Sequence, residues 1–267
     1  MGTKRRGTFF LALALALVLG LTAAAQADTL EGIIQRGELR VAVQTQGPPF
    51  SFVDKNGERT GSSVEFCKMI AQEMGVKVVF LDFDWDGLIP ALLSKKADIL
   101  AADMTAKLSR ALKVSFTEPF YTTSQVMYVK AGSPIKTVAD ANKPEVTVAT
   151  LLGSSYTDVA RKAMPKATIK EYKGGGNIAM NAVVAGHADV GVADLSVVHA
   201  MAANYPEGTL TVLPTMLSYD PLCFAVRPED RHLLEWINLF FDWIRADGRY
   251  EQNMEYWIKT NAWQADH

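Results

Sequence analysis

Cysteine and histidine are scarce in this chain. Cys67 and Cys223 are the only two cysteines among 267 residues, and each lies in an apolar segment. That setting favours two buried free thiols, with a disulfide bridge as the alternative in an exported protein. The four histidines show no ligand spacing with cysteines or carboxylates, so we expect neither a metal centre nor another cofactor.

Long apolar runs are equally rare, because the only one lies near the N-terminus. It covers residues 9–21, follows the basic residues Lys4, Arg5 and Arg6, and precedes the small-residue pattern of residues 25–27. This order is typical of a secretory signal peptide, and we expect cleavage after Ala27. The run is short for a spanning helix of roughly 20 residues, which disfavours an uncleaved anchor. No cysteine lies directly after the expected cleavage site, so we expect a soluble periplasmic protein without a lipid anchor.

An excess of positive charge is also absent. The formal net charge is −2, and removal of residues 1–27 takes away three positive charges and no negative ones, which gives −5. We therefore expect no nucleic-acid partner. The 240 residues that remain after 27 are removed from 267 can bury a large core as one domain or two.

Short apolar strands alternate with amphipathic helices along the chain, which is the pattern of an α/β fold with a mainly parallel sheet. A second series begins after the polar, turn-rich stretch 133–144. The glycine run 174–176 lacks the lysine of a phosphate loop and predicts a turn before a helix capped by Asn177. The predicted strands are 39–43, 76–81, 99–102, 146–149, 169–172 and 189–193, and the predicted helices are 61–74, 86–95, 156–163 and 177–185.

The C-terminal segment repeats neither series. A strand is predicted at 222–226, followed by amphipathic helices at 233–246 and 250–260. Aromatic residues recur there at helical spacing, which indicates a stripe that packs into the core rather than a cofactor site. The members of this stripe are Trp236, Phe240, Trp243 and Trp257.

Arg110 lies in the most specific pattern of the chain, the stretch ADILAADMTAKLSRALKVSFTEPFY from Ala97 to Tyr121. It closely resembles the signature of bacterial extracellular solute-binding protein family 3, the polar amino-acid binding proteins of ABC importers. An arginine fork forms two parallel charge-assisted hydrogen bonds with a carboxylate, so the resemblance implies that Arg110 holds the carboxylate of an amino acid. The matching residues are Asp98, Met104, Thr105, Arg110, Phe116, Thr117, Pro119 and Tyr121.

A glycine-hydroxyl turn in the second half resembles the family's second carboxylate contact. Gly153, Ser154 and Ser155 open a predicted helix, where amides and hydroxyls favour an anion. The resemblance implies that Ser155 assists Arg110, and it adds Thr105 in the turn before Arg110 as a further ligand-binding residue. The alternative is an ordinary serine N-cap.

The segment from Gly186 to Asp194 resembles the family's G-x-x-D-x-x-x-x-D pattern. Asp194 ends a predicted strand, and the resemblance implies that it takes the ligand's ammonium. Asp189 is expected to support the turn. With Arg110 on one lobe and Asp194 on the other, ligand binding and lobe closure would be one event.

Side-chain specificity is expected from the first half. The proline-rich segment 48–52 and the turn 84–86 resemble the family's PPF and WD elements, which makes Phe50 and Trp85 candidate aromatic walls. Neither Gln44 nor Ser51 supplies an extra acid, and this disfavours a lysine or arginine ligand.

Two residues depart from the family pattern. Lys107 stands where many relatives have threonine, and Asp103 stands where many have glycine or serine. The two are four positions apart and either pair with each other or act on the ligand. In the second case Asp103 adds a carboxylate for the ammonium, and Lys107 favours an acidic side chain.

The resemblance spans roughly residues 30–258 and implies a two-lobe periplasmic binding protein fold of type II, α/β, with a mainly parallel sheet flanked by helices in each lobe. Lobe 1 would comprise residues 28–123 and 219–267, and lobe 2 residues 124–218. A two-segment hinge is expected near residues 122–126 and 217–222.

The implied function is non-enzymatic capture of an amino acid or close analogue, and its transfer by a monomer to an inner-membrane ABC permease. The strongest alternative is a periplasmic cyclohexadienyl or arogenate dehydratase on the same fold. Those enzymes use a glutamate shortly after the glycine-hydroxyl turn as general acid, where this chain has Thr157 and Asp158. A receptor sensor domain is less favoured, because no membrane segment follows Trp263.

Overall fold

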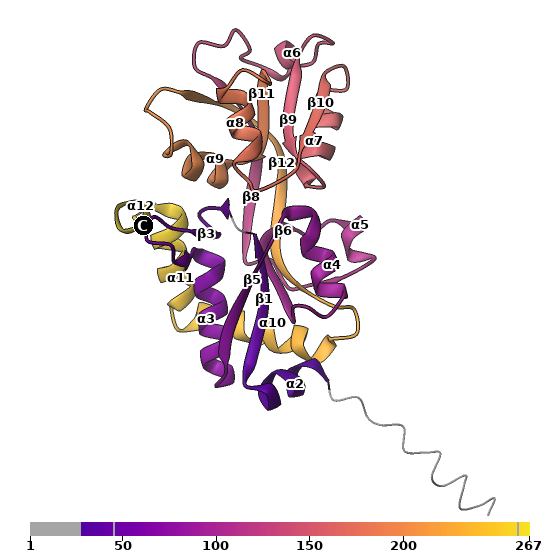
Figure 1. Ribbon diagram of the computed structural model, residues 1–267, viewed down its shortest axis with the longest axis vertical. Helices are drawn as coiled ribbons and strands as arrows, with labels where there is room; N and C mark the ends of the chain where they lie inside the picture. Colours follow the sequence, from indigo (N-terminus) through magenta and orange to yellow (C-terminus); the bar gives the residue numbers. More distant parts are fainter. Residues whose placement is uncertain (1–27, 45, 261) are drawn as a thin grey trace, which may run out of the picture.

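The computed structural model describes residues 28–44, 46–260 and 262–267, so the signal peptide predicted at residues 1–27 lies outside the described residues. Figure 1 shows two groups of elements joined by the long strands β8 (Tyr121–Lys130) and β12 (Leu210–Val226). We call the lower group, α2 to β7 with α10 to α12, the first lobe. The upper group, α6 to α9, is the second lobe.

Parallel strands form the centre of the first lobe. β1 pairs with β5 on one side and with β6 on the other, and Val41 lies opposite both Phe80 and Ile99. Helices α3 and α4 cover opposite sides of these strands (Figure 1). Such two-sided cover explains why β6 is buried along its whole length. The elements are α2 (Thr29–Arg36), β1 (Glu38–Gln44), α3 (Ser62–Met74), β5 (Lys77–Phe83), α4 (Leu88–Leu93), β6 (Ile99–Thr105), α5 (Leu108–Ala111), β7 (Ser115–Phe116) and α10 (Arg231–Ala246).

The second lobe repeats this plan. β9 pairs in parallel with β10 and β11, and α7 lies on the opposite side of these strands from α8 and α9 (Figure 1). Its elements are α6 (Val138–Ala141), β9 (Thr147–Leu151), α7 (Ser155–Ala163), β10 (Thr168–Tyr172), α8 (Ile178–Val184), β11 (Val190–Asp194) and α9 (Leu195–Ala202).

Strands β8 and β12 connect the lobes into one sheet. They pair antiparallel from Leu210 opposite Lys130 to Leu222 opposite Tyr121, while β11 joins β8 and β6 joins β12. The resulting order is β10-β9-β11-β8-β12-β6-β1-β5, with β7 on β12. The predicted α/β fold is therefore confirmed, but the two parallel sheets are continuous, and the strand predicted at 222–226 is the end of β12. Local periodicity does not show this pairing between distant segments.

Other boundaries also differ from the predictions. The helix predicted at 86–95 is split into η1 (Trp85–Gly87) and α4, and Lys95 follows it with a left-handed φ of 60°. The helix predicted at 250–260 is α11 (Arg249–Met254) followed by a π-helical turn, η2 (Glu255–Lys259). The remaining elements are α12 (Trp263–Asp266) and a small sheet of β2 (Gln46–Gly47), β3 (Ser51–Val53) and β4 (Arg59–Thr60).

The aromatic stripe near the C-terminus is only partly in the core. Phe240 and Trp257 are buried and Trp236 packs against the core, but Trp243 is 64% exposed, so the core prediction is wrong for that residue. Helical spacing correctly predicted the helix. The apolar face of that helix is wider than the face that the core buries, and Trp243 lies outside the buried part.

Cys67 in α3 and Cys223 in β12 are both buried free thiols, which confirms the first of the two alternatives. Burial raises the pKa of Cys223 to about 12, so this thiol stays protonated at neutral pH.

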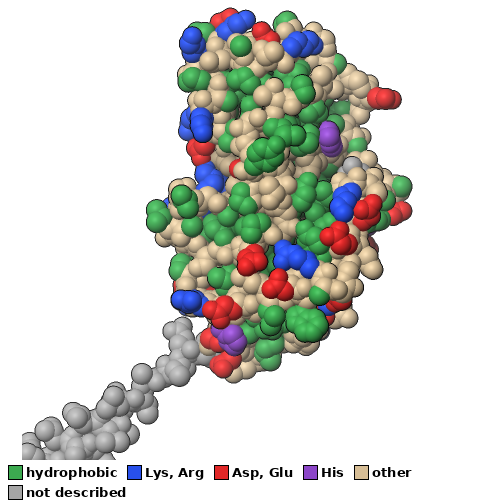
Figure 2. All heavy atoms as spheres, turned by 180° about the vertical axis from the view of Figure 1, so that it is seen from behind, with side chains coloured by type: hydrophobic (Ala, Val, Ile, Leu, Met, Phe, Trp, Pro, Cys, Tyr) green, Lys and Arg blue, Asp and Glu red, His purple; other side chains and the backbone are tan. Residues whose placement is uncertain are grey.

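The surface carries charges of both signs. On the face that Figure 2 shows, basic and acidic side chains are interspersed rather than gathered by sign. Within the described ranges, no helix has the length and apolar character needed to cross a membrane.

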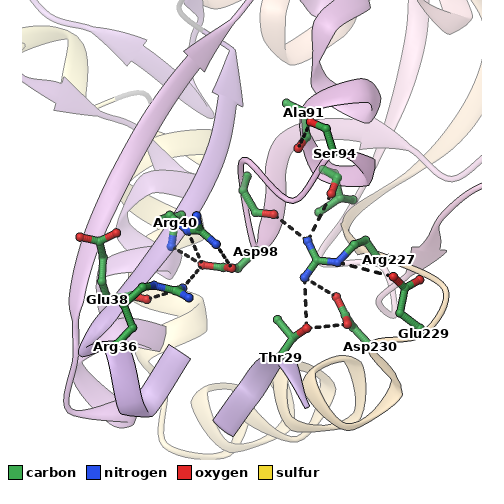
Figure 3. A network of polar contacts seen from close by, with 12 residues as sticks. Thr29, Arg36, Glu38, Arg40, Ala91, Ser94, Asp98, Arg227, Glu229 and Asp230 are labelled. Carbon is green, nitrogen blue, oxygen red and sulfur yellow. Dashed lines mark hydrogen bonds and ion pairs between the residues drawn. The ribbon is translucent and has the colours of Figure 1, made fainter. Parts of the chain in front are cut away.

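Asp98 and Arg227 tie together the end of the first lobe that lies far from the second lobe (Figure 3). Asp98 accepts hydrogen bonds from Arg36 at 2.6 Å and from the Arg40 backbone N–H and guanidinium at 2.8 and 2.9 Å. Arg227 pairs with Asp230 at 2.7 Å. Asp98 thus holds the start of β6, which runs from this network to the lobe junction.

Candidate functional site

Arg110 lies where the two lobes meet. It belongs to the short helix α5, directly after β6, and its guanidinium donates to the Thr105 carbonyl at 2.9 Å and to the Gly153 carbonyl of the second lobe at 3.1 Å. The side chain lies over the Trp85 ring at 5.5 Å, and the residue is only 8% exposed. Among the described residues no carboxylate forms an ion pair with it. Burial lowers the pKa of Arg110, but a guanidinium keeps its charge in proteins.

A chain of polar side chains crosses the junction beside Arg110. The hydroxyl oxygens of Thr105 and Ser155 lie 3.1 Å apart, and the Gln125 amide donates to Ser155 at 2.9 Å. Ser154 donates to the Leu151 carbonyl at 2.7 Å and makes no side-chain cap. The simple N-cap alternative therefore fails, since the Ser155 hydroxyl faces the first lobe.

Asp194 ends β11 and lies inside the same junction. It is 1% exposed, one carboxylate oxygen accepts from the Tyr156 hydroxyl at 3.0 Å, and the other has no hydrogen-bond partner among the described residues. Burial raises the pKa of Asp194 to about 8, against the opposing effect of the Tyr156 hydrogen bond. Asp189, by contrast, directly precedes β11 and accepts from the Thr147 backbone N–H at the start of β9, as a supporting residue does.

Asp103 is a second buried carboxylate at this centre. It is 3% exposed, and Oδ1 has no partner in the described part of the chain. Burial and then the charge of Asp194 raise the pKa of Asp103, while Arg110 acts in the opposite direction. The three side chains thus lie close enough for their charges to interact.

An irregular stretch of β6 places Asp103. Leu100 lies opposite Ala225 and Met104 opposite Cys223, so three residues of β6 face one of β12. Asp103 takes up this excess with a left-handed φ of 47°. Bulges next to binding sites commonly redirect a side chain in this way, and Asp and Asn tolerate that backbone better than most residues.

The two predicted aromatic walls lie in different settings. Trp85 contacts Arg110 and approaches Gly153 across the junction. Phe50 is fully buried and packs against Phe120 and Tyr121, with ring centroids 6.1 and 6.0 Å apart. Phe50 therefore lies beneath Tyr121, the partly buried ring whose pKa is raised by burial and by the charge of Asp194.

Lys107 pairs with Asp158 of the second lobe rather than with Asp103. Of the two alternatives for these residues, the mutual pair is wrong, because Asp103 is buried within β6, whereas Lys107 lies beyond the end of β6 and reaches Asp158 on α7. A second ion pair across the junction joins Lys173 to Asp86 at 3.5 Å. The lobes are therefore in direct contact.

A cleft of about 470 Å³ opens beside Arg110 between the lobes. Its lining combines apolar, polar and charged side chains of the first lobe with Gly153 of the second lobe. The lining residues include Trp85, Ile89, Met104, Lys107, Arg110 and Gly153.

Gln125, Tyr156 and Asp220 belong to the site but were not predicted. Gln125 lies on β8 between Ser124 and Val126, and Tyr156 directly follows Ser155. Asp220, on β12, is buried and accepts from the Ser218 hydroxyl. No local signal singles out Gln125, because the polar residues Thr122, Thr123 and Ser124 precede it on the same strand.

A two-lobe α/β protein with an arginine, hydroxyls and carboxylates at the junction is a solute-binding protein of type II. The chain belongs to the bacterial extracellular solute-binding proteins, family 3, whose pattern matches residues 39–260.

Solved structures of related proteins share the fold. The ancestral amino acid-binding protein AncCDT-1, described as a precursor of cyclohexadienyl dehydratase, is 39% identical, with a TM-score of 0.79 over 86% of this chain and 99% of that one. A binding component of an ABC transporter from Wolinella succinogenes, complexed with lysine, is 36% identical, with a TM-score of 0.80 and the same coverage. The L-cystine-binding protein TcyJ of Escherichia coli (strain K12) is 28% identical over 94% of both chains.

Proposed function

We propose that this protein captures an amino acid, or a close analogue, between its lobes and passes it to the permease of an ABC importer. The observation that carries the proposal is Arg110, a buried cation at the lobe junction with no carboxylate partner among the described residues. A ligand carboxylate supplies that partner through charge-assisted hydrogen bonds.

Neighbouring groups complete a site for an amino acid. Ser155 and Thr105 offer hydroxyls to the carboxylate, and the turn at Gly153, Ser154 and Ser155 offers the backbone N–H groups of Gly153 and Ser155 at the start of α7, while the Ser154 N–H donates to the Leu151 carbonyl at 3.1 Å. Asp194 presents a free oxygen to the ammonium.

The remaining candidate residues shape the space around the ligand. Trp85 and Phe50, through Tyr121, supply aromatic walls. Asp103 adds negative charge, and Lys107 closes the junction through Asp158.

Closure of the two lobes on the ligand follows from this division of contacts. We assign lobe 1 to residues 28–123 and 219–267 and lobe 2 to residues 124–218. The hinge segments at 122–126 and 217–222 then fall within β8 and β12, the two strands that connect the lobes. Ligand contacts on both sides stabilise the closed form only if they differ between the two states.

Export of the chain agrees with its family of extracellular proteins. We propose a mature periplasmic monomer, cleaved after Ala27, which acts with an inner-membrane ABC permease. Cleavage can be checked by N-terminal sequencing of the secreted protein.

The dehydratase alternative receives less support from the residues after the glycine-hydroxyl turn. Thr157 is buried, lies 2.9 Å from the Thr150 hydroxyl and donates to Glu171. Asp158 is exposed and engaged with Lys107. Neither is placed as a free proton donor in the cleft, and the related chains named above include amino-acid-binding proteins.

A thermal-shift screen against amino acids, opines and small dicarboxylates tests the proposal. Ligand at 100 times its Kd stabilises the native state by roughly 2.7 kcal/mol, and the lysine bound to the Wolinella succinogenes relative makes lysine the first ligand to try. In parallel, incubation with prephenate or arogenate should give no aromatic product. Turnover that is lost in Asp158→Asn would establish the dehydratase instead.

A further inference from the structure

The charges at the lobe junction do not balance for a neutral amino acid. Asp103, Asp194 and Asp220 are all buried there. Among the described residues, Arg110 is the one cation whose charge acts on both Asp103 and Asp194. A zwitterion adds one carboxylate and one ammonium, so it leaves the excess of negative groups unchanged. Without a further cation these buried carboxyl groups hold protons, as the raised pKa values of Asp103 and Asp194 indicate, so their joint ionisation calls for a second cation at the junction.

The hydrogen-bond inventory points the same way. Gln125 and Asp194 are directly opposed in the β8–β11 pairing, so their side chains project from the same face of the sheet. Gln125 uses its amide N–H on Ser155 and Asp194 uses one oxygen on Tyr156. Gln125 Oε1, Asp194 Oδ1 and Asp103 Oδ1 are buried acceptors without partners among the residues described. Three unmatched acceptors suit donor-rich cations, since an ammonium brings three donors and a guanidinium five.

The backbone of Asp103 indicates that this carboxylate is built into the site. Asp103 follows the excess residues of β6 with a left-handed φ of 47°, and its side chain is buried in reach of the charge of Asp194. Lys107 is the cation nearest to Asp103 in the sequence, but it forms its ion pair with Asp158. Sparsely populated backbone conformations of this kind cluster at ligand-binding positions.

We propose that the lobe junction selects amino acids with a second cationic group, an amine or a guanidinium, and that Asp103 is the residue that sets this selectivity. The proposal rests on the function proposed above. Asp194 and Asp103 together compensate the α-ammonium and the side-chain cation, while Gln125 accepts a further hydrogen bond. The acid that is missing at Gln44 and Ser51 is thereby supplied from β6.

Calorimetry with charge-matched ligands tests this assignment. The wild type is titrated with lysine and arginine and with their neutral counterparts norleucine and citrulline, which keep a similar chain length. We expect the cationic ligands to bind at least about 100-fold more tightly. Asp103→Asn keeps the left-handed backbone acceptable, and we expect it to lose most of this preference while neutral ligands bind as before or better. Asp103→Gly, which tolerates the same φ, should behave alike.

Asp242→Asn, an exposed change on α10 with the same effect on net charge, is the matched control and should keep the full preference. Equal affinity for cationic and neutral ligands in the wild type would overturn the inference. So would a loss in Asp103→Asn that is the same for both classes. If neutral amino acids bind and depend on Arg110, the proposed function survives without the inference. If no amino acid binds, both fail.

Discussion

Asp98 and Asp103 lie near the two ends of the buried strand β6, and their carboxylates differ in their hydrogen-bond partners. Asp98 accepts from Arg36 and Arg40, so its charge is compensated within the fold (Figure 3). Asp103 keeps an oxygen with no partner in the described residues. A buried carboxylate that is paired within the fold contributes to stability. A buried carboxylate without a partner indicates where a ligand binds.

Two buried arginines repeat the same contrast. Arg227, at the far end of the first lobe, pairs with Asp230 and donates to the Ala97 carbonyl at 2.8 Å. Arg110, at the lobe junction, donates only to carbonyls. The comparison thus places a stabilising centre and a binding centre at opposite ends of β6, and substitutions in each should affect different properties.

The largest expected effect separates these two arginines. Arg110→Ala should weaken amino-acid binding by roughly 10²- to 10⁴-fold, because it removes two charge-assisted bonds worth about 1.5–3 kcal/mol each. Arg227→Ala should instead cost about 3–5 kcal/mol of unfolding free energy, because it leaves the Asp230 carboxylate buried and unpaired. Calorimetry and denaturant unfolding measure the two quantities.

Arg161→Ala, an exposed arginine paired with Glu171, is the control and should change neither quantity by much. Wild-type affinity in Arg110→Ala would remove the carboxylate clamp from the proposed function. If Arg227→Ala lost binding but kept its stability, the assignment of a stabilising centre and a binding centre to opposite ends of β6 would be wrong.

Much of this arrangement could be predicted from the sequence, because the motifs combine chemistry with local order. The strand, turn and arginine around Arg110, the turn at Ser155 and the strand end at Asp194 each occupy a short stretch, and the structure brings all three to one junction. Alternating periodicity similarly predicted most strands and helices of both lobes.

The parts that could not be predicted depend on pairing between distant segments. Spacing allowed a Lys107–Asp103 pair as one of two alternatives, but the partner of Lys107 is Asp158, which only the approach of the lobes brings near. Gln125 was overlooked because its partner, Ser155, lies 30 residues further along the chain. The continuous sheet was missed for the same reason.

The next effect concerns pH. Burial raises the pKa of Asp194 from 3.8 to about 8, so the folded protein keeps a proton that the unfolded chain loses as pH rises above about 4. This contribution to stability is complete below the unfolded pKa and is lost as pH rises through about 8. Ligand-free wild type should therefore lose stability between pH 5 and 8, and Asp194→Asn should show a shallower loss, by several degrees of Tm.

The slope in Asp194→Asn should not vanish, because other groups face the same centre. Those groups are Asp103 on β6, Arg110 on α5, Tyr121 on β8, Tyr156 on α7 and Asp220 on β12. A cationic ligand favours the ionised carboxylate, so wild-type affinity should rise with pH over the same interval. Identical pH profiles for wild type and Asp194→Asn would show that Asp194 does not carry the proton.

The smallest expected effect lies at the rim of the junction, between Lys107 and Asp158. Both side chains reach solvent, and exposed ion pairs contribute about 0–1 kcal/mol, so Lys107→Met should change affinity by less than about tenfold. Small-angle scattering should still show the protein becoming more compact with ligand. A double-mutant cycle with Asp158→Asn should give a coupling energy that falls as salt is added. If Lys107→Met instead abolished binding of acidic amino acids, Lys107 would be a direct ligand contact, and the excess of negative charge at Asp103 and Asp194 would no longer define the specificity of the cleft.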